Sequence, residues 1–429
     1  MIDINLLRND PQYVANALLK KDCTIDMEIL LQLDKNKRKI IMDLEKMKFD
    51  RNRCSAEVCQ LKREGESFEE MIENNKKLGE EIKAKEAELE IVTDKFNKIF
   101  YALPNLPDDD LVAGGKENNE PVYTFGTKPH FHFSPKSHVD LCTSLNLIDY
   151  ERAAKLSGNG FWIYTGLGAQ LEWALLNFFI SEHIKDGYQF ILPPEMLNKE
   201  CGFGSGQFPK FADEVYYVNK FNGEKTEQFL LPTAESALVN LFAGEIIAEK
   251  DLPKKLFAYS PCFRLEAGSY RAGERGTIRG HQFNKVEMVA YTKPKDANKM
   301  FDEMVNKAKR LMEKLGLHYQ VSKLAAGDVS DTMTRTYDIE VWIPSMSIYK
   351  EVSSVSNGRA YQARRSNTRY RDSEGKTDFV NILNGSGLAT SRILPAIVEQ
   401  FQTPDGGVII PEVLRPFMNG LEEIKPINK

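Results

Sequence analysis

The clearest regularity in the chain is a pair of apolar repeats between residues 27 and 100. In the first repeat, positions 30, 33, 37, 40, 44, 47, 51, 54, 58 and 61 alternate spacings of three and four, and all are apolar except Lys37 and Arg51, with Cys54 counted as apolar. In the second, only Asn75 and Lys85 are polar among positions 71, 75, 78, 82, 85, 89, 92, 96 and 99. Two such stretches around one tight break predict an antiparallel coiled-coil hairpin.

The break between the repeats has residues suited to helix ends. Gly65 suits the end of the first helix, and Ser67, three residues before Glu70, suits a capping box at the start of the second. Upstream, Asp10 and Pro11 suit the N-cap and first position of a short helix. At 1.5 Å per residue, each arm of the hairpin extends on the order of 50 Å.

Lysine and arginine are frequent on the outer positions of this hairpin, about sixteen of them between Lys35 and Lys98. They are either the solvated surface of an ordinary coiled coil or contacts to a phosphate backbone. A long arm that contains no pocket is useful when the protein must reach a large partner. This favours an RNA recognised by its shape and backbone rather than by its base edges.

The chain changes character after Pro104 and Pro107. Residues 105–128 are rich in proline, glycine, asparagine and aspartate and are typical of a linker, so we expect domains at 1–105 and 106–429. From residue 136 onward, helix-like and strand-like runs alternate, which predicts an α+β fold. Ala169–Lys185 has helical periodicity and YQFILPPEML follows as a strand. The glycine-rich pieces at 166–170 and 202–208 lack the residues of a P-loop and are interpreted as turns.

A dense group of charges lies between Phe263 and Glu287. Four arginines at 264, 271, 275 and 279 fall between a short strand-like piece, FRLE, and a longer one, HQFNKVEMVAY. Arginine matches phosphate oxygens two at a time and stays charged, while Phe283 offers a face on which a purine can stack. The stretch is therefore either an exposed hairpin or a site for a polyphosphate.

Three further segments combine strand, turn and helix signals with polar residues. Residues 228–247 predict a strand, a turn at Pro232–Glu235 and a helix capped by Thr233. Residues 337–354 predict a strand hairpin turning near Pro344. Residues 381–401 predict a strand, a tight turn at Gly385 and Gly387, and a helix.

These motifs occur in the order of a known family. R-x-E, a loop and then R-x-H-Q-F-x-K-x-E resembles motif 2 of the class II aminoacyl-tRNA synthetases, and HQFNKVE resembles the bacterial-type seryl-tRNA synthetases in particular. Residues 169–197 resemble motif 1, GSGLATSR resembles motif 3, and GSGQFPKF and GGVIIPEVLRPFM are also similar to the family. The resemblance covers nearly all of the chain. It implies an N-terminal coiled-coil hairpin followed by a class II core, an antiparallel sheet flanked by helices.

The resemblance implies a site for ATP and Mg²⁺. Arg264 would hold the α-phosphate, Glu266 the adenine end, Phe283 the base, Arg279 the outer phosphates and Arg392 the γ-phosphate. Glu351 and Ser354 would hold Mg²⁺, and Leu265, Val352 and Ser353 would complete the ATP contacts. The catalytic residues by this likeness are Arg264, Glu351 and Arg392.

The resemblance also implies a serine site at Thr233, Ala234, Glu235, Arg264, Glu287, Asn384 and Ser386. An ammonium group needs a carboxylate, and a buried hydroxyl needs paired donors and acceptors. The implied activity is formation of seryl-adenylate and transfer to tRNA-Ser, or to a selenocysteine tRNA, by a homodimer. Two alternatives are a ligase that activates serine for a carrier protein or biosynthesis, and a non-catalytic RNA-binding paralogue.

Composition limits the setting of this activity. The net charge of −5 does not by itself attract nucleic acid, so RNA contacts must come from local basic patches. Six scattered cysteines without a C-x-x-C pair, no signal-like N-terminus and no long apolar run predict a cytoplasmic protein without a membrane span. The loop S-Y-R-A-G-E-R-G-T-I-R departs from the usual motif 2 run at 271–276, where family members meet the tRNA acceptor end.

Overall fold

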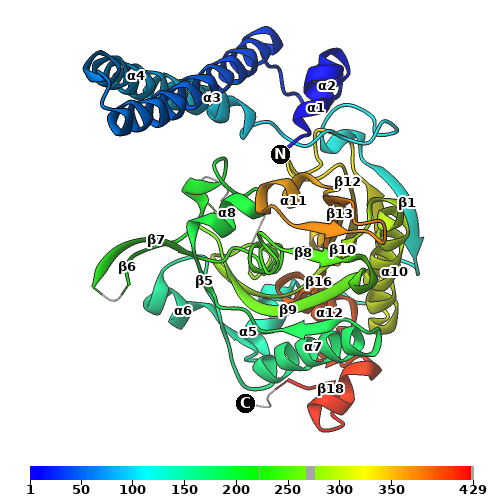
Figure 1. Ribbon diagram of the computed structural model, residues 1–429. Coiled ribbons are helices and arrows are strands. Elements are labelled where there is room, and N and C mark those ends of the chain that lie inside the picture. The colour runs from blue at the N-terminus through cyan, green and yellow to red at the C-terminus, as the bar shows by residue number, and fades with distance from the viewer. Residues whose placement is uncertain (222, 267–275, 427–429) are drawn as a thin grey trace. The chain divides into compact units, whose positions relative to one another are not determined.

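The computed structural model describes residues 1–221, 223–266 and 276–426, and the chain forms two compact units (Figure 1). One unit comprises Ile4–Asn16 and Cys23–Leu103. The other comprises Met1–Asp3, Ala17–Asp22 and Pro104–Lys429. Helices of the described residues are too short or too polar to cross a membrane.

The first unit contains the predicted helical hairpin, formed by α3 (Met27–Glu64) and α4 (Glu69–Phe100), together with α1 (Ile4–Asn9) and part of α2 (Pro11–Leu19). Ile40, Leu44 and Ile82 form its buried core, and Met47, Leu78, Leu89 and Val92 pack against them. Within the fully described stretch 27–100, the buried side chains are Leu30, Asp34, Ile40 and Leu44 of α3 and Ile82, Phe96 and Phe100 of α4. The heptad pattern thus predicted both helices.

The turn at the tip of the hairpin follows only half of the prediction. Gly65 ends α3 in the left-handed conformation at φ 76°, and its N–H donates to the Leu61 carbonyl. Ser67 was expected to cap α4, but the N-cap is Phe68. The Glu69 carboxylate accepts from the Ser67 hydroxyl (2.9 Å) and the Phe68 N–H (3.1 Å). The Ser67 hydroxyl therefore contacts the Glu69 side chain instead of capping the helix. At α2, the Asp10 carboxylate accepts from the Tyr13 N–H (3.0 Å), as the sequence predicts.

The second unit is built on an eight-stranded sheet in the order β1-β11-β12-β13-β16-β10-β9-β4. Neighbouring strands pair antiparallel except β4 and β9, which are parallel. The strands are β1 (Glu120–Phe125), β4 (Gln189–Ile191), β9 (Lys254–Phe263), β10 (Gln282–Thr292), β11 (Tyr319–Lys323), β12 (Arg335–Ile343), β13 (Ile348–Asn357) and β16 (Asn381–Ala389). The α+β fold is the one expected.

Helices and short sheets surround this sheet (Figure 1). The helices are α5 (His138–Ser144), α6 (Tyr150–Ser157), α7 (Gly166–Lys185), α8 (Lys199–Ser205), α9 (Glu235–Leu238), α10 (Ala297–Leu315), α11 (Tyr361–Ser366) and α12 (Thr390–Gln400). The small sheets pair β2 (Ile148–Asp149) with β3 (Ile163–Tyr164), β17 (Val408–Ile409) with β18 (Glu423–Ile424), β7 (Glu224–Leu230) with β5 (Met196–Leu197) and β6 (Tyr217–Phe221), and β14 (Arg369–Arg371) with β8 (Ile246–Ala248) and β15 (Thr377–Phe379).

Strand β10 separates two hydrophobic cores because its side chains alternate between the faces of the sheet. Val286, Met288 and Ala290 belong to a large core shared with α7, α10 and α12. Val289 and Tyr291 belong to a smaller core shared with residues of α9 and α11. Odd-numbered residues of β10, including Phe283, Lys285 and Glu287, therefore face the side of α9 and α11.

Several glycine-containing predictions were wrong for one reason. The piece at 166–170 begins α7 and that at 202–208 lies largely in α8 rather than in turns, and Gly385 and Gly387 lie inside β16. A Cβ at Gly168 would lie 2.0 Å from the Leu147 carbonyl, and one at Gly202 would lie 2.4 Å from the Phe208 ring. These glycines allow neighbouring segments to approach closely, and tertiary packing overrides their low helix propensity.

Two segment boundaries also differ from the expectation. The stretch 105–128 contains β1 at the edge of the main sheet, so it is more than a linker. In FRLE only Phe263 is in a strand, because β9 ends there and Glu266 has a φ of 47°. The hairpin of β12 and β13 turns at Pro344–Met346, as predicted.

Candidate active site

A pocket on the α9 and α11 side of the sheet brings together eight of the predicted site residues. The predicted residues that line it are Arg264, Glu266, Arg279, Phe283, Glu351, Val352, Ser386 and Arg392. Ile278, Gly280, Lys285, Ala389 and Ser391 complete the lining. Residues more than 120 positions apart in the chain thus meet because β10, β13 and β16 are neighbours in the sheet.

Each arginine of the pocket is held by a specific contact. The Arg264 Nε donates to the Pro232 carbonyl (3.2 Å), and its guanidinium lies 5.2 Å from the centre of the Phe283 ring. Arg279 pairs with Glu266 (2.7 Å). Arg392 donates from Nε to the Ile278 carbonyl (3.1 Å) and from Nη1 to the Glu351 carbonyl (2.6 Å). These contacts fix three cations around one cavity.

A buried acidic cluster adjoins the cationic pocket. Ser386, which lines the pocket, donates to Glu287 (3.3 Å), and Glu287 pairs with Lys285 (2.5 Å). Gln362 of α11 donates to Glu235 (2.7 Å). Burial, reinforced by the negative charge of Glu287, raises the pKa of Glu235 to about 7, although hydrogen bonds from Gln362 and Asn384 oppose the shift. A ligand ammonium would relieve this repulsion.

The remaining predicted residues lie beside the pocket, outside its lining. Thr233 is buried and its hydroxyl accepts from the Glu235 N–H (3.2 Å), so α9 begins at Glu235 with Ala234 as its N-cap rather than Thr233. Ser353 donates to the Ser386 carbonyl (2.6 Å), and the Leu265 N–H donates to the Glu214 carbonyl (3.1 Å). Residues 267–275, with Arg271, Arg275 and most of the unusual loop, lie outside the described residues.

The residues predicted for Mg²⁺ fit a hard cation. Ser354 pairs with Asp338 across β12 and β13, and its hydroxyl hydrogen-bonds the Asp338 carboxyl. The other oxygen of that carboxyl, Oδ1, is buried and has no hydrogen-bond partner among the described residues. Burial and then the charge of Glu351 hold the Asp338 pKa well above its usual range. Carboxylate and hydroxyl oxygens are suitable ligands for Mg²⁺.

Gly387 lies in β16 against α7. A Cβ at this position would come within 2.1 Å of the His183 Nε2. Burial and nearby Lys307 lower the pKa of His183 to about 3, so the ring is neutral where it packs. The glycine predicted to form a tight turn is therefore required by the packing of a histidine.

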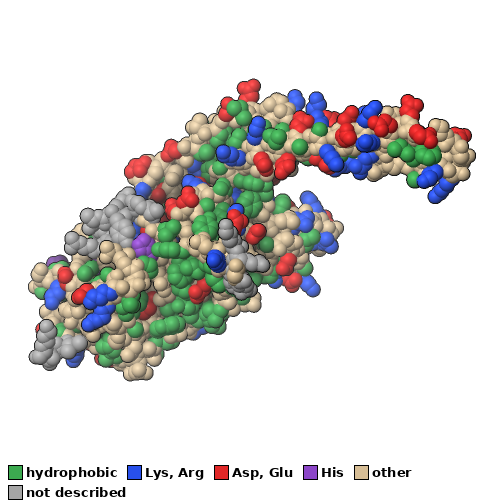
Figure 2. Space-filling view, turned by 90° about the vertical axis from the view of Figure 1, so that its left-hand side faces the viewer, with side chains coloured by type: hydrophobic (Ala, Val, Ile, Leu, Met, Phe, Trp, Pro, Cys, Tyr) green, Lys and Arg blue, Asp and Glu red, His purple; other side chains and the backbone are tan. Residues whose placement is uncertain are grey.

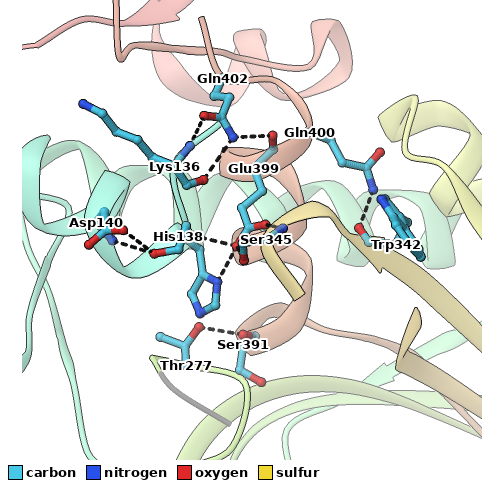
Figure 3. A network of polar contacts seen from close by, with 11 residues as sticks. Lys136, His138, Asp140, Thr277, Trp342, Ser345, Ser391, Glu399, Gln400 and Gln402 are labelled. Carbon is cyan, nitrogen blue, oxygen red and sulfur yellow. Dashed lines mark hydrogen bonds and ion pairs between the residues drawn. The ribbon is translucent and has the colours of Figure 1, made fainter. Parts of the chain in front are cut away.

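Helix α12, which carries Arg392, is anchored at its other end by a buried carboxylate (Figure 3). Glu399 accepts from the His138 N–H (2.8 Å) and the Ser345 N–H (2.8 Å), and contacts His138 Nδ1 (2.6 Å). Burial alone would raise the Glu399 pKa, but hydrogen bonds from His138 and Ser345 hold it below its usual value. Thr277 donates to the Ser391 carbonyl (2.7 Å), which ties the residues after the undescribed loop to the start of the same helix.

We expect Glu399→Gln to lower stability by about 2–3 kcal/mol, because it removes a buried charge that accepts several hydrogen bonds. The measurement is chemical denaturation of both proteins. Glu423→Gln, at a half-buried surface position, is the matched control and should have an unfolding midpoint close to the original. Equal stability of the two variants would contradict the anchoring role of Glu399.

Lys285, Gln362 and Ser391 are polar residues of the site for which the sequence gave no separate prediction. Lys285 was visible as the residue between Phe283 and Glu287 on one face of a strand. Gln362 and Ser391 gave no local signal, because α11 reaches the site only through the tertiary fold and Ser391 contributes from the first turn of α12.

The antiparallel sheet carries this arginine-lined pocket beside an acidic cluster, and comparison with known families identifies the arrangement as a class II aminoacyl-tRNA synthetase core. Residues 216–401 match the family model of the tRNA synthetase class II core domain (G, H, P, S and T), and residues 1–107 match the seryl-tRNA synthetase N-terminal domain.

Similar proteins agree over the full chain. Serine--tRNA ligase 2 of Clostridium acetobutylicum is 56% identical over 97% of this chain and 99% of its own. Serine--tRNA ligase of Nitratidesulfovibrio vulgaris is 44% identical over 99% of this chain and 100% of its own. The crystal structure of seryl-tRNA synthetase from Pyrococcus horikoshii complexed with ATP superposes with a TM-score of 0.90 at 32% identity over all of both chains. The chain belongs to the seryl-tRNA synthetase family.

Proposed function

We propose that the protein activates L-serine with ATP to form seryl-adenylate and then transfers the seryl group to tRNA-Ser. The observation that supports it best is the division of one site into a cationic part, with Arg264, Arg279 and Arg392, and an anionic part, with Glu235 and Glu287. A triphosphate fits the first part and an amino-acid ammonium fits the second. Ser386 belongs to the pocket and contacts Glu287, so the two parts are contiguous.

Activation is an in-line attack of the serine carboxylate on the α-phosphate, with pyrophosphate as the leaving group. Arg264 would hold the α-phosphate, Arg279 and Arg392 the outer phosphates, Phe283 the adenine ring, and Glu266 the edge of the base. Backbone and side-chain contacts from Leu265, Val352 and Ser353 would complete the ATP site. Fixed cations lower the barrier because they meet the developing charge without reorganising.

Mg²⁺ would be held by Glu351 and Ser354. When bound, it neutralises phosphate charge. The chain's own contribution is to orient these oxygens: the Asp338 carboxyl fixes the Ser354 hydroxyl, and the Arg392 guanidinium fixes the backbone at Glu351.

Serine would be recognised by Glu235, Glu287, Asn384 and Ser386, with Thr233 and Ala234 shaping the turn before Glu235 and Arg264 holding the carboxylate. Alanine and glycine lack the hydroxyl, so their binding would leave buried polar groups unpaired. Sites of this kind discriminate strongly against such analogues.

The tRNA would bind through the N-terminal arm, residues 1–105, while residues 106–429 carry the catalysis. Figure 2 shows basic and acidic side chains mixed along the hairpin, so binding depends on local groups of lysines and arginines.

Helix α7 leaves the side chains of Trp173 and Ile184 about half exposed, and we assign this helix to a homodimer interface, as its likeness to motif 1 implies. We assign the protein to the cytoplasm.

The test is serine-dependent exchange of pyrophosphate into ATP, followed by aminoacylation of tRNA-Ser. We expect both activities with serine and neither with alanine. Exchange without charging would favour the ligase for a carrier protein or biosynthesis. Loss of both activities in a folded protein that still binds RNA would favour the non-catalytic paralogue.

The raised pKa of Glu235 predicts a pH dependence of serine binding. With a pKa of about 7, Glu235 is mostly protonated at pH 6 and ionised at pH 8, whereas the substrate ammonium is charged at both values. Serine affinity should therefore rise about tenfold from pH 6 to pH 8. The KM for serine in pyrophosphate exchange measures this, and Glu235→Gln should bind weakly with a flat profile. A flat profile in the unsubstituted protein would contradict the assignment.

A further inference from the structure

Lys285 is a buried cation that none of the expected roles uses. It lies in β10, its side chain is about one-tenth exposed, and it lines the pocket together with Arg264, Phe283 and Glu351. Among the described residues, its ammonium forms an ion pair with the Glu287 carboxylate at 2.5 Å. Burying a lysine is costly unless a charge or substrate compensates for it.

The position of Lys285 along the strand gives it a definite place between the two ligands. Phe283, Lys285 and Glu287 are every second residue of β10, so their side chains lie on the same face of the strand. The Glu287 carboxylate accepts a hydrogen bond from the Ser386 hydroxyl (3.3 Å). If Phe283 binds the adenine ring and Glu287 the serine ammonium, Lys285 lies between them. The atoms that react, a carboxylate oxygen of serine and the α-phosphorus of ATP, would meet between Phe283 and Glu287, beside Lys285.

Charge argues for the same role. A carboxylate and a phosphate must approach each other although both are negative, so a cation at their junction lowers the barrier. Lysine provides a compact, rotatable point charge, unlike the planar fork of the neighbouring arginines. The ammonium of serine can replace that of Lys285 as the partner of Glu287, which frees the lysine to turn toward the carboxylate.

We propose that Lys285 is a further catalytic residue of adenylate formation, whose ammonium holds the serine carboxylate against the α-phosphate. The carboxylate oxygen forms a bond to the α-phosphorus, the bond from that phosphorus to the bridging oxygen breaks, and the electron pair leaves with pyrophosphate. No proton is transferred. This role rests on the proposed function.

The experiment compares Lys285→Met with Lys285→Arg in single-turnover formation of seryl-adenylate at saturating serine and ATP. Methionine keeps the length of the stem and removes the charge, so we expect the rate constant to fall by about 10²- to 10³-fold. The arginine variant should retain more of the rate. The dissociation constant for ATP should change by less than about threefold, which shows that the pocket has folded. Lys255→Met, which removes a lysine paired with Glu303 outside the pocket lining, is the matched control and should keep the full rate.

A second comparison separates action on the substrate from neutralisation of Glu287. In a Glu287→Gln background, Lys285→Met should still slow adenylate formation by a similar factor. If it has no further effect there, or if the single variant changes only the KM for serine, Lys285 acts merely as the counter-ion of Glu287 and the proposal is overturned. Failure of the unsubstituted protein to exchange pyrophosphate with serine would instead refute the proposed function itself.

Discussion

Arg392→Ala is expected to reduce serine-dependent pyrophosphate exchange by about 10³-fold or more while leaving the fold intact. Arg392 lines the pocket and is held by the carbonyls of Ile278 and Glu351, so its guanidinium is fixed before the triphosphate binds. Removal of such a preorganised charge is costly in phosphoryl chemistry. The measurement is the exchange rate at saturating ATP, with the thermal midpoint recorded on the same preparation.

Arg415→Ala is the matched control for this variant. Arg415 also donates from Nε to a backbone carbonyl, that of Ile410 (3.2 Å), and pairs with a glutamate, Glu422 (3.1 Å), but it is not among the residues that line the pocket. Its removal should leave the exchange rate unchanged. Wild-type exchange by Arg392→Ala would refute the phosphate assignment, and equal losses in both variants would indicate general destabilisation.

Replacement of residues 30–100 by a short flexible linker is expected to abolish tRNA charging and to spare pyrophosphate exchange. The deleted stretch lies wholly in the unit formed by Ile4–Asn16 and Cys23–Leu103, and the pocket is built from the other unit. We expect kcat/KM for tRNA to fall by at least about 10³-fold, because the arm would supply most phosphate contacts. Both reactions should be measured on one preparation.

A charge variant tests the same arm without shortening it. Lys48, Arg51, Lys76 and Lys83 line one groove of the hairpin. Alanine at all four positions should raise the KM for tRNA, more at low salt than at high salt because salt already screens these contacts, and leave exchange unchanged. Charging by the shortened protein at the original rate would contradict the role of the arm in RNA binding.

The sequence predicted those features that depend on local periodicity. The heptads gave α3 and α4, and strand alternation gave β12 and β13 with their turn, because the side chains that decide these elements are near neighbours in the chain. The order of motifs also identified eight residues that the fold brings to one pocket. Here the family resemblance, not periodicity, carried the information.

Features that depend on distant packing could not be predicted in this way. Gly168 and Gly202 were assigned to turns because the atoms that require them, the Leu147 carbonyl and the Phe208 ring, are defined only by the fold. Gln362 was missed for a similar reason, since its contact with Glu235 joins α11 to α9 across 127 positions. Ser67 failed as a cap, and its hydroxyl instead donates to the adjacent Glu69 carboxylate.

The uneven core of the hairpin has a consequence for how it binds. The fully buried side chains of α3 reach only to Leu44, and those of α4 begin only at Ile82, so the stretch from 45 to 81 packs through partly buried side chains such as Met47 and Leu78. Such a segment unfolds locally at a lower free energy than the part of the hairpin around Ile40, Leu44 and Ile82, so its backbone amides exchange with solvent first. An RNA that orders this end gives up part of its binding free energy, which favours rapid release of the charged product.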